Sequence, residues 1–361
     1  MGRIVIAPDS FKGSLDAAPV ADAIAAGWRS VRPDDELVLL PQADGGEGTL
    51  DAVASAVPLA RVRDAGPVTG PDGRPVEGHW LLLPDGTAVI ELAQPSGLPL
   101  MAALDPLGAT TRGLGEVIGR ALDEAPARLV IGLGGSASTD GGAGALAALG
   151  LGLLDEAGVA IPDGGGALAQ LARIDRSGLR PAPPGGVRLL SDVTAPLFGP
   201  RGAAAVFGPQ KGAGPDDVAA LDAALARFAG LLGGDPERAG AGAAGGTGYG
   251  FAAAWGAVLE PGSSAIAELT GLTAAAAGAD VLLTGEGRFD ATSRTGKAVG
   301  NALELVAGTT ARAGVISGRV DADPGCWSVA LVDLAGSPDE ALRDPARWLA
   351  EAGAAAARAL G

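Results

Sequence analysis

The sequence predicts an α/β protein of two domains, and three observations support that class. Apolar runs typical of strands alternate with Gly-rich loops and helical stretches along most of the chain. A length of 361 residues is enough for two hydrophobic cores. Hydrophobic residues make up 47% of the chain but aromatic residues only 3%, which favours helices packed closely on a sheet over an aromatic-rich sandwich.

The N-terminal part repeats the order strand, loop, helix. Residues 4–6 form an apolar, β-branched run typical of a buried parallel strand, and Asp16 is a candidate N-cap for the helix after the next loop. A second apolar run at 37–40 leads into another Gly-rich loop and helix. Because ligands collect at the carboxyl ends of such strands, both loops are candidate sites.

The pattern changes at Arg61. Pro-Gly turns at 70–73 and 84–86 separate short strand-like runs, as expected for hairpins of a mixed sheet. Strand-loop-helix units and single strands then return at 129–149, 187–193, 281–305, 313–316 and 329–332, before a closing Ala-rich helix.

The predicted organisation is therefore one domain inserted into another. Residues 1–63 and 263–361 are expected to form a Rossmann-like parallel-sheet domain, and residues 64–262 a second, mixed α/β domain within it. The glycine-dense stretch 239–250 is predicted to be a flexible loop or hinge.

Composition excludes several classes of function. The net charge of −16 argues against nucleic acids and anionic membranes as partners. A single cysteine, Cys326, excludes an internal disulfide framework and a multi-thiolate metal site, and a single histidine, His79, excludes metal motifs that need two histidines. Both residues are expected to be structural. No segment resembles a signal peptide or reaches membrane-spanning length, so a soluble, cytoplasmic protein is expected.

Lysine is rare and its placement is informative. Of 26 basic residues only three are lysine, namely Lys12, Lys211 and Lys297, and each stands next to a glycine in a loop-like setting. An ammonium group is a common point-charge partner for phosphate, so positions where arginine has not replaced lysine are candidates for anion binding. Coincidence is the alternative, because glycine is 60 of the 361 residues.

Polar side chains recur in the loops that follow predicted strands. These loops hold Asp9, Ser10 and Lys12; Asp44 and Glu47; Gly134, Gly135, Ser136 and Asp140; Asp192; and Glu286, Arg288 and Asp290 ahead of Lys297. Residues 132–142, with backbone N–H groups, hydroxyls and a helix N-terminus, are predicted to form an anion cradle. Carboxylates, lysines and Gly-rich loops together are the parts required for phosphoryl transfer. The alternative for a single acid, such as Glu47 or Asp140, is a helix cap.

Two common nucleotide motifs do not explain this pattern. The chain has no Gly-x-x-x-x-Gly-Lys-[Ser/Thr] sequence, because Lys297 is followed by Ala298. Residues 132–137 meet a loose dinucleotide-binding pattern, which is a weak signal in a chain this rich in glycine.

Sequence blocks along nearly the whole chain resemble the bacterial type I glycerate kinase family, which is distinct from the other two glycerate kinase types. The blocks include Ile-Ala-Pro-Asp-Ser-Phe-Lys-Gly-Ser at 6–14, Ala-Asp-Gly-Gly-Glu-Gly-Thr at 43–49, Gly-Gly-Ser-Ala at 134–137, Asp-Val-Thr at 192–194, Gly-Pro-Arg-Gly-Ala at 199–203, Val-Phe-Gly-Pro-Gln-Lys-Gly at 206–212, Gly-Ala-Ala-Gly-Gly at 242–246 and Thr-Gly-Glu-Gly-Arg at 284–288. The resemblance implies ATP- and Mg²⁺-dependent phosphorylation of D-glycerate, with 2-phosphoglycerate favoured over 3-phosphoglycerate as the product. It also implies an active site in the cleft between two α/β domains.

The chain departs from the family pattern at several polar positions. Thr139 and Ala195 stand where the family often has asparagine, Thr292 where it has glutamine, and Ile316-Ser317-Gly318 replaces an Ala-Gly-[Ser/Gln] element. Several side-chain amides are thus missing, and a shifted acceptor preference or lower activity is expected.

Roles are assigned by combining the residues with the resemblance. Lys12, Lys211 and Lys297 are expected to contact phosphates or the glycerate carboxylate, with Lys12 and Lys297 in the catalytic group. Asp192 or Asp290 is the candidate base, and Asp44, Glu47 and Glu286 are the pool of Mg²⁺ ligands. Further substrate or phosphate contacts are expected from Asp9, Ser10, Gly134, Gly135, Ser136, Asp140 and Arg288.

Two rival functions stay open at this stage. One is a nicotinamide-dependent dehydrogenase that uses the loose dinucleotide pattern, and the other is a non-catalytic protein that binds an organic acid. ATP and D-glycerate are the expected small-molecule partners, and a homodimer is one option for the oligomeric state.

Overall fold

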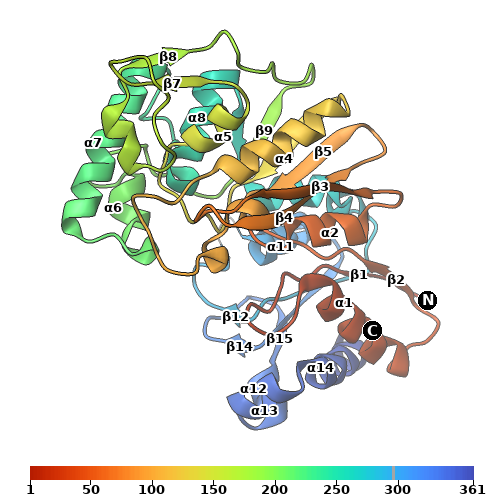
Figure 1. Cartoon of the computed structure of the whole chain (residues 1–361). Coiled ribbons are helices and arrows are strands. Elements are labelled where there is room, and N and C mark those ends of the chain that lie inside the picture. The colour runs from red at the N-terminus through yellow and green to blue at the C-terminus, as the bar shows by residue number, and fades with distance from the viewer. Residues whose placement is uncertain (295–296) are drawn as a thin grey trace. The chain divides into compact units, whose positions relative to one another are not determined.

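The computed structural model describes residues 1–294 and 297–361, which divide into two compact units. Unit 1 comprises Met1–Asp44, Asp51–Pro58 and Pro261–Gly361, and unit 2 comprises Gly45–Leu50 and Leu59–Glu260. Each unit has its own sheet, and the chain is traced in Figure 1. A compact unit need not fold on its own. The domain boundaries expected from the sequence therefore stay a prediction.

Unit 1 is built on a five-stranded parallel sheet with the order β15-β13-β11-β1-β2. Its strands are β1 (Arg3–Ile6), β2 (Glu36–Leu39), β11 (Val281–Thr284), β13 (Arg312–Ser317) and β15 (Trp327–Ala330). Successive side chains of a strand point to opposite faces, and both faces of β1 are apolar. Ile4 and Ile6 belong to one buried cluster and Val5 to another. The continuous apolar run noted in the sequence is therefore explained by burial on both sides.

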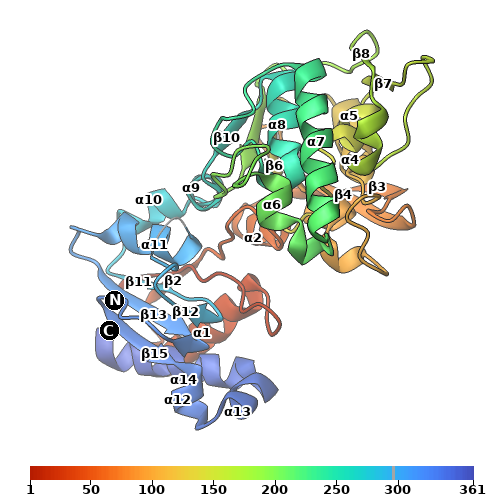
Figure 2. The same ribbon diagram turned by 90° about the vertical axis from the view of Figure 1, so that its left-hand side faces the viewer.

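Helices cover both faces of this sheet. Unit 1 contains α1 (Ala17–Val31), most of α2 (Thr49–Ala56), α9 (Gly262–Leu269), α10 (Leu272–Ala276), α11 (Ala298–Val306), α12 (Leu331–Ala335), α13 (Pro338–Arg343) and α14 (Pro345–Leu360). Figure 2 shows α10 and α11 on one side of the strands and α14 on the other. Helices α1 and α14 contribute Ile24, Trp28 and Leu349 to the cluster around Ile4. A small parallel pair, β12 (Arg288–Phe289) with β14 (Arg319–Val320), completes the unit.

Unit 2 contains a six-stranded mixed sheet with the order β10-β9-β6-β5-β4-β3. Strands β5 (Thr87–Glu91), β6 (Arg128–Gly132), β9 (Val187–Leu190) and β10 (Val258–Glu260) are parallel, whereas β3 (Arg61–Thr69) and β4 (Pro75–Leu82) add an antiparallel hairpin at one edge. The hairpins predicted from the Pro-Gly turns are thus confirmed. A separate antiparallel pair is formed by β7 (Gly152–Leu154) and β8 (Arg173–Asp175).

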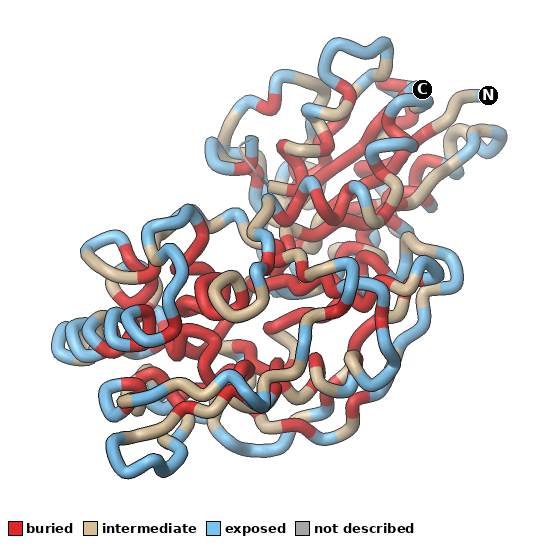
Figure 3. The backbone as a smooth tube through the Cα atoms, turned by 90° about the horizontal axis from the view of Figure 1, so that it is seen from above, coloured by how far each residue is buried: buried red, intermediate tan, exposed pale blue. Residues whose placement is uncertain are grey.

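Helices of unit 2 enclose a single large cluster of buried side chains. They are α3 (Ala93–Ser96), α4 (Arg112–Asp123), α5 (Ala143–Ala148), α6 (Ala203–Phe207), α7 (Pro215–Leu232) and α8 (Ala243–Trp255), with 3₁₀ turns at Leu98–Leu100, Gly166–Gln170 and Pro209–Lys211. Leu114 of α4, Ile131 of β6 and Phe228 of α7 are fully buried together in this cluster. Figure 3 shows buried backbone, in red, in the interior and exposed backbone, in pale blue, mostly at the periphery. The predicted two-part α/β class, with one parallel and one mixed sheet, is confirmed.

The glycine-dense stretch 239–250 is mostly helical, so the prediction of a loop is wrong, and the alternative of a hinge stays a prediction. Much of it forms the buried first half of α8, with a kink at Ala244–Gly246 where the backbone has positive φ. A Cβ on Gly245 would lie 2.0 Å from the carbonyl oxygen of Ser138, and one on Gly250 would lie 2.2 Å from that of Gly141. The glycines are required for close packing against the 138–141 segment, a need that composition alone does not reveal.

Three smaller expectations have mixed outcomes. Asp16 does precede α1 at the N-cap position, but its side chain makes no capping hydrogen bond. His79 lies in β4, where its Nδ1 is 2.6 Å from Nε2 of Gln94, and Cys326 is partly buried against an apolar cluster, so both have structural surroundings. In the described part of the chain, no helix combines the length and apolar character needed to cross a membrane.

Candidate active site

A pocket of about 460 Å³ lies in unit 1, at the carboxyl ends of two adjacent strands. Strands β1 and β11 pair in parallel, so the loops that leave them start side by side. The N–H of Asp9 donates to the carbonyl of Gly285 at 2.8 Å, which joins the two loops. Predicted site residues from these loops and their neighbours line the pocket: Asp9, Ser10, Lys12, Asp44, Glu286, Arg288 and Lys297.

Acidic side chains crowd one part of this pocket. Burial, and then the nearby charge of Asp44, raise the pKa of Asp9 to about 7. Burial likewise raises the pKa of Glu286, although a hydrogen bond with Ser293 and the charge of Lys297 oppose that shift. The Oε1 atom of Glu286 is buried and has no hydrogen-bond partner within the described residues. A cation bound beside these acids would stabilise their charged forms.

Cationic side chains lie at the same pocket. Lys12 lines the pocket and is exposed. Lys297 also lines it, and its Nζ donates to Oγ1 of Thr292 at 3.0 Å. Arg288 instead forms an ion pair with Asp321, with 2.7 Å between Nε and Oδ2. Arg319 also lines the pocket and shares Asp321 with Arg288, so one carboxylate partly neutralises both arginines. Lys12 and Lys297 add two further positive charges that a ligand could meet here.

Sequence reasoning missed the apolar wall of this pocket. Leu331, Leu342 and the two prolines Pro338 and Pro345 also line it, from α12, α13 and α14. No sequence signal marks these residues, because an exposed leucine on a short helix is ordinary. Leu342 is 63% exposed, a feature that only the structure reveals.

A second pocket, of about 380 Å³, lies in unit 2. Strands β6 and β9 pair in parallel and end together at Gly132 and Leu190, so the segments that follow them meet. Predicted site residues that line this pocket are Gly134, Gly135, Ser136, Lys211 and Glu47. The loop that carries Glu47 is held in unit 2 by Glu91, which accepts hydrogen bonds from the N–H groups of Gly48 and Leu50.

Lys211 is the most buried charged group at either pocket. Only 3% of the residue is exposed, and its Nζ donates to Oγ of Ser136 at 2.9 Å and to the carbonyl of Ser138 at 2.5 Å. Burial lowers its pKa to about 8, and the charge of Asp140 acts in the opposite direction. The 3₁₀ turn that carries it ends at Gly212, whose φ of 94° suits glycine.

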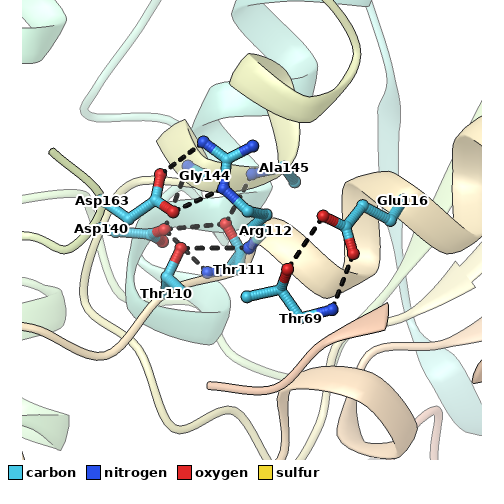
Figure 4. A network of polar contacts seen from close by, with 9 residues as sticks. All are labelled: Thr69, Thr110, Thr111, Arg112, Glu116, Asp140, Gly144, Ala145 and Asp163. Atoms are coloured by element: carbon cyan, nitrogen blue, oxygen red, sulfur yellow. Dashed lines mark hydrogen bonds and ion pairs between the residues drawn. The ribbon is translucent and has the colours of Figure 1, made fainter. Parts of the chain in front are cut away.

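Asp140 lies inside unit 2 and acts there as a structural cap. It is fully buried, and its carboxylate accepts hydrogen bonds from the N–H and the hydroxyl of Thr111 and from the N–H of Gly144 (Figure 4). The N–H of Gly142 also donates to it. The first N–H groups of α5 therefore already have acceptors: Ala143 donates to the carbonyl of Asp140, Gly144 to its carboxylate and Ala145 to Oγ1 of Thr111. The anion cradle expected in segment 132–142 stays a prediction, and Gly134, Gly135 and Ser136 are its members that line the unit 2 pocket.

Replacing Asp140 by Asn tests this structural role. The amide would leave at least one buried N–H without an acceptor, so the free energy of unfolding is expected to fall by about 2–3 kcal/mol. Urea unfolding measures this change in the free energy of unfolding. Asp163→Asn is the matched control in the same network, because Asp163 pairs with partly exposed Arg112 and should contribute less than about 1 kcal/mol. Unchanged stability of Asp140→Asn, with weaker substrate binding, would contradict the structural role.

The two candidate bases have different surroundings. Asp290 is near the surface, and hydrogen bonds from the hydroxyl and N–H of Thr292 lower its pKa. Asp192 is exposed in the loop after β9, and the residues on either side of it, Ser191 and Val193, line the unit 2 pocket. Neither aspartate itself belongs to the residues that line the two pockets in the part of the chain that the structure describes.

Comparisons with known proteins agree with one another. The model of the Glycerate kinase family matches residues 4–361. The chain is 46% identical over 304 residues to the glycerate kinase of Bacillus subtilis (strain 168), covering 82% of this chain and 79% of that protein. It is 45% identical over 308 residues to the glycerate 2-kinase of Escherichia coli (strain K12), with the same two shares covered.

A solved structure has the same fold. The crystal structure named for a glycerate kinase 2 from Salmonella typhimurium LT2 superposes with a TM-score of 0.87 at 39% sequence identity. The match covers 99% of this chain and 98% of that chain. The similarity therefore extends over both units.

Proposed function

Because the chain belongs to the glycerate kinase family, we propose that it transfers the terminal phosphoryl group of ATP to D-glycerate, with 2-phosphoglycerate as the product. The observation that carries the proposal is the family match over residues 4–361. The relative named glycerate 2-kinase supports the 2-hydroxyl as the acceptor. The acids and lysines in the unit 1 pocket supply the chemistry that phosphoryl transfer needs.

The unit 1 pocket is the proposed site for the nucleotide. Lys12 and Lys297 would neutralise phosphate oxygens, as point charges that can follow the group during transfer. Ser10 offers a hydroxyl donor in the same loop as Lys12. The apolar wall that includes Leu331 suits the rest of a nucleotide, since ligand pockets are mostly apolar with a few convergent polar groups.

Asp44 and Glu286 are the proposed Mg²⁺ ligands. The buried, unpartnered Oε1 of Glu286 and the raised pKa of Asp9 fit a site that is completed by a cation. Within the described residues no group of three or more acidic, His or Cys side chains could hold a metal, and Mg²⁺ typically needs only one or two carboxylates besides substrate phosphates. When bound, Mg²⁺ would neutralise phosphate charge. Glu47 lines the unit 2 pocket and is left out of this ligand set.

Asp192 is the proposed base. A base must accept the hydroxyl proton of the acceptor, and a lowered pKa weakens that ability. Asp290 has such a lowered pKa because of its hydrogen bonds with Thr292, whereas Asp192 lies between two residues that line the unit 2 pocket. The role of Asp290 is then to orient Thr292, which accepts a hydrogen bond from Lys297.

Release of ADP from ATP and Mg²⁺ in the presence of small hydroxy acids tests the function. D-glycerate is expected to give the fastest release, with much less from lactate, which lacks the 3-hydroxyl. Equal release with every acid, or none, would contradict the proposal. Binding of NAD without ATP turnover would favour the dehydrogenase alternative, and acid binding without turnover would favour a sensor.

A further inference from the structure

Lys211 is a buried cation without a direct counterion. Its Nζ hydrogen bonds go to two neutral acceptors, the hydroxyl of Ser136 and the carbonyl of Ser138. Asp140 is the acid that influences its charge, but the carboxylate hydrogen bonds of Asp140 go to Thr111, Gly142 and Gly144. An ammonium has three N–H groups, so one N–H of Lys211 is left for another acceptor.

Burying an unpaired ammonium is unfavourable. Taking such a charge out of water costs several kcal/mol unless an opposite charge compensates, and the lowered pKa of Lys211 reflects that cost. A methionine of similar length would fill the same space without the cost of burying a charge. A fold that keeps lysine here, in a chain that otherwise uses arginine for positive charge, points to an anionic ligand at the pocket that Lys211 lines.

The other groups at this pocket favour a small, singly charged anion. Ser191 and Gln210 offer uncharged polar groups, and Phe207 and Leu98 are apolar. Lys211 is the one cationic side chain among the described lining residues, and Glu47 adds a negative charge. A polyphosphate would meet too little positive charge here, whereas one carboxylate is matched by one ammonium.

We propose that Lys211 binds the carboxylate of the acceptor acid, so that the unit 2 pocket is the carboxylate subsite. This assignment rests on the proposed function, because it takes glycerate as the acid. The ammonium is held by Ser136 and Ser138 and donates its remaining N–H to a carboxylate oxygen. The close packing of Gly245 against Ser138 helps to fix that arrangement.

The test compares Lys211→Met with wild type on two acceptors, D-glycerate and glycerol, which lacks the carboxylate. For D-glycerate, KM is expected to rise about 100-fold while KM for ATP stays within about threefold. With glycerol, which has no carboxylate to lose, kcat/KM should be nearly the same for both proteins. A purely structural role would instead lower activity on both acceptors by the same factor, and that result would overturn the proposal.

Two further measurements, of thermal stability and of direct glycerate binding, separate a loss of binding from a loss of folding. Lys211→Met should melt close to the wild-type temperature, because removal of an unpaired buried charge offsets the loss of the hydrogen bonds to Ser136 and Ser138. Calorimetric titration of D-glycerate without nucleotide should show binding to wild type and none to Lys211→Met. Exposed Arg120→Met, which removes one charge from the same unit, is the matched control and should bind like wild type.

Ser136→Ala provides an independent check, because it removes only the hydroxyl that holds the ammonium. It should weaken glycerate binding less than Lys211→Met does. Loss of ADP release in wild type with retained, Lys211-dependent glycerate binding would reject the proposed function but support the subsite. Normal turnover with unchanged glycerate KM in Lys211→Met would reject the subsite alone.

Discussion

Asp192→Asn should lower kcat for glycerate phosphorylation by about 10²- to 10⁴-fold, the range that a positioned base contributes. Asp290→Asn should change kcat by less than about tenfold, because its carboxylate is engaged by Thr292 and has a lowered pKa. The physical reason is that a base must be able to take the proton when the bond to phosphorus forms. Steady-state kinetics at saturating ATP and glycerate measure both variants.

Mg²⁺ dependence separates a base from a metal ligand. Asp192→Asn should keep the wild-type apparent affinity for Mg²⁺, because a base acts after Mg·ATP has bound. Rescue of Asp192→Asn by high Mg²⁺ concentration would show instead that this side chain is a ligand. A larger loss of kcat in Asp290→Asn than in Asp192→Asn would make Asp290 the base and reverse the assignment.

Asp9→Asn should stabilise the ligand-free protein at about pH 8 and have little effect near pH 4. The folded-state pKa of Asp9, about 7, lies above the unfolded value of 3.8, so the folded state binds more protons in that interval. The free energy of unfolding therefore falls as pH rises from about 4 to about 7. A shift of this size corresponds to about 4 kcal/mol at most, and partial exposure reduces it to about 2 kcal/mol.

Urea unfolding at the two pH values measures this difference, with exposed Asp16→Asn as the control from the same unit. Equal effects of Asp9→Asn at both pH values, or destabilisation at pH 8, would contradict the account. At pH 8, Mg²⁺ with a non-hydrolysable ATP analogue should raise the free energy of unfolding of the wild-type protein, because the cation reduces the repulsion between the crowded acids. Glu286→Gln should reduce that gain, since it removes the charge of a proposed ligand.

The sequence predicted those parts of the fold and the site that depend on a strong local pattern and a simple rule of packing. Apolar runs such as 4–6 became buried parallel strands, and Pro-Gly turns marked the hairpin of β3 and β4. Polar residues at strand carboxyl ends were expected to converge, and Asp9, Lys12 and Glu286 do line one pocket. These features depend on short stretches of chain whose geometry is nearly fixed by their residues.

Features that depend on contacts distant in sequence could not be predicted. The glycines of α8 are required by segment 138–141, about 100 residues earlier in the chain. The buried carboxylate of Asp140 is paired with Thr111, and sequence alone left both a cap and a ligand contact open for it. The raised pKa of Asp9 depends first on its burial and then on the nearby charges of Asp44 and Glu286, none of which the sequence shows.

Phosphorus NMR of the completed reaction tests the central claim most directly. With ATP, Mg²⁺ and D-glycerate, a new phosphomonoester resonance should appear together with ADP, and coupling to the single proton on carbon 2 should split it into a doublet. A triplet, from the methylene protons of carbon 3, would contradict the proposed acceptor hydroxyl. Conversion of ATP to ADP and inorganic phosphate alone, or no conversion, would contradict the assignment of this chain as a glycerate kinase.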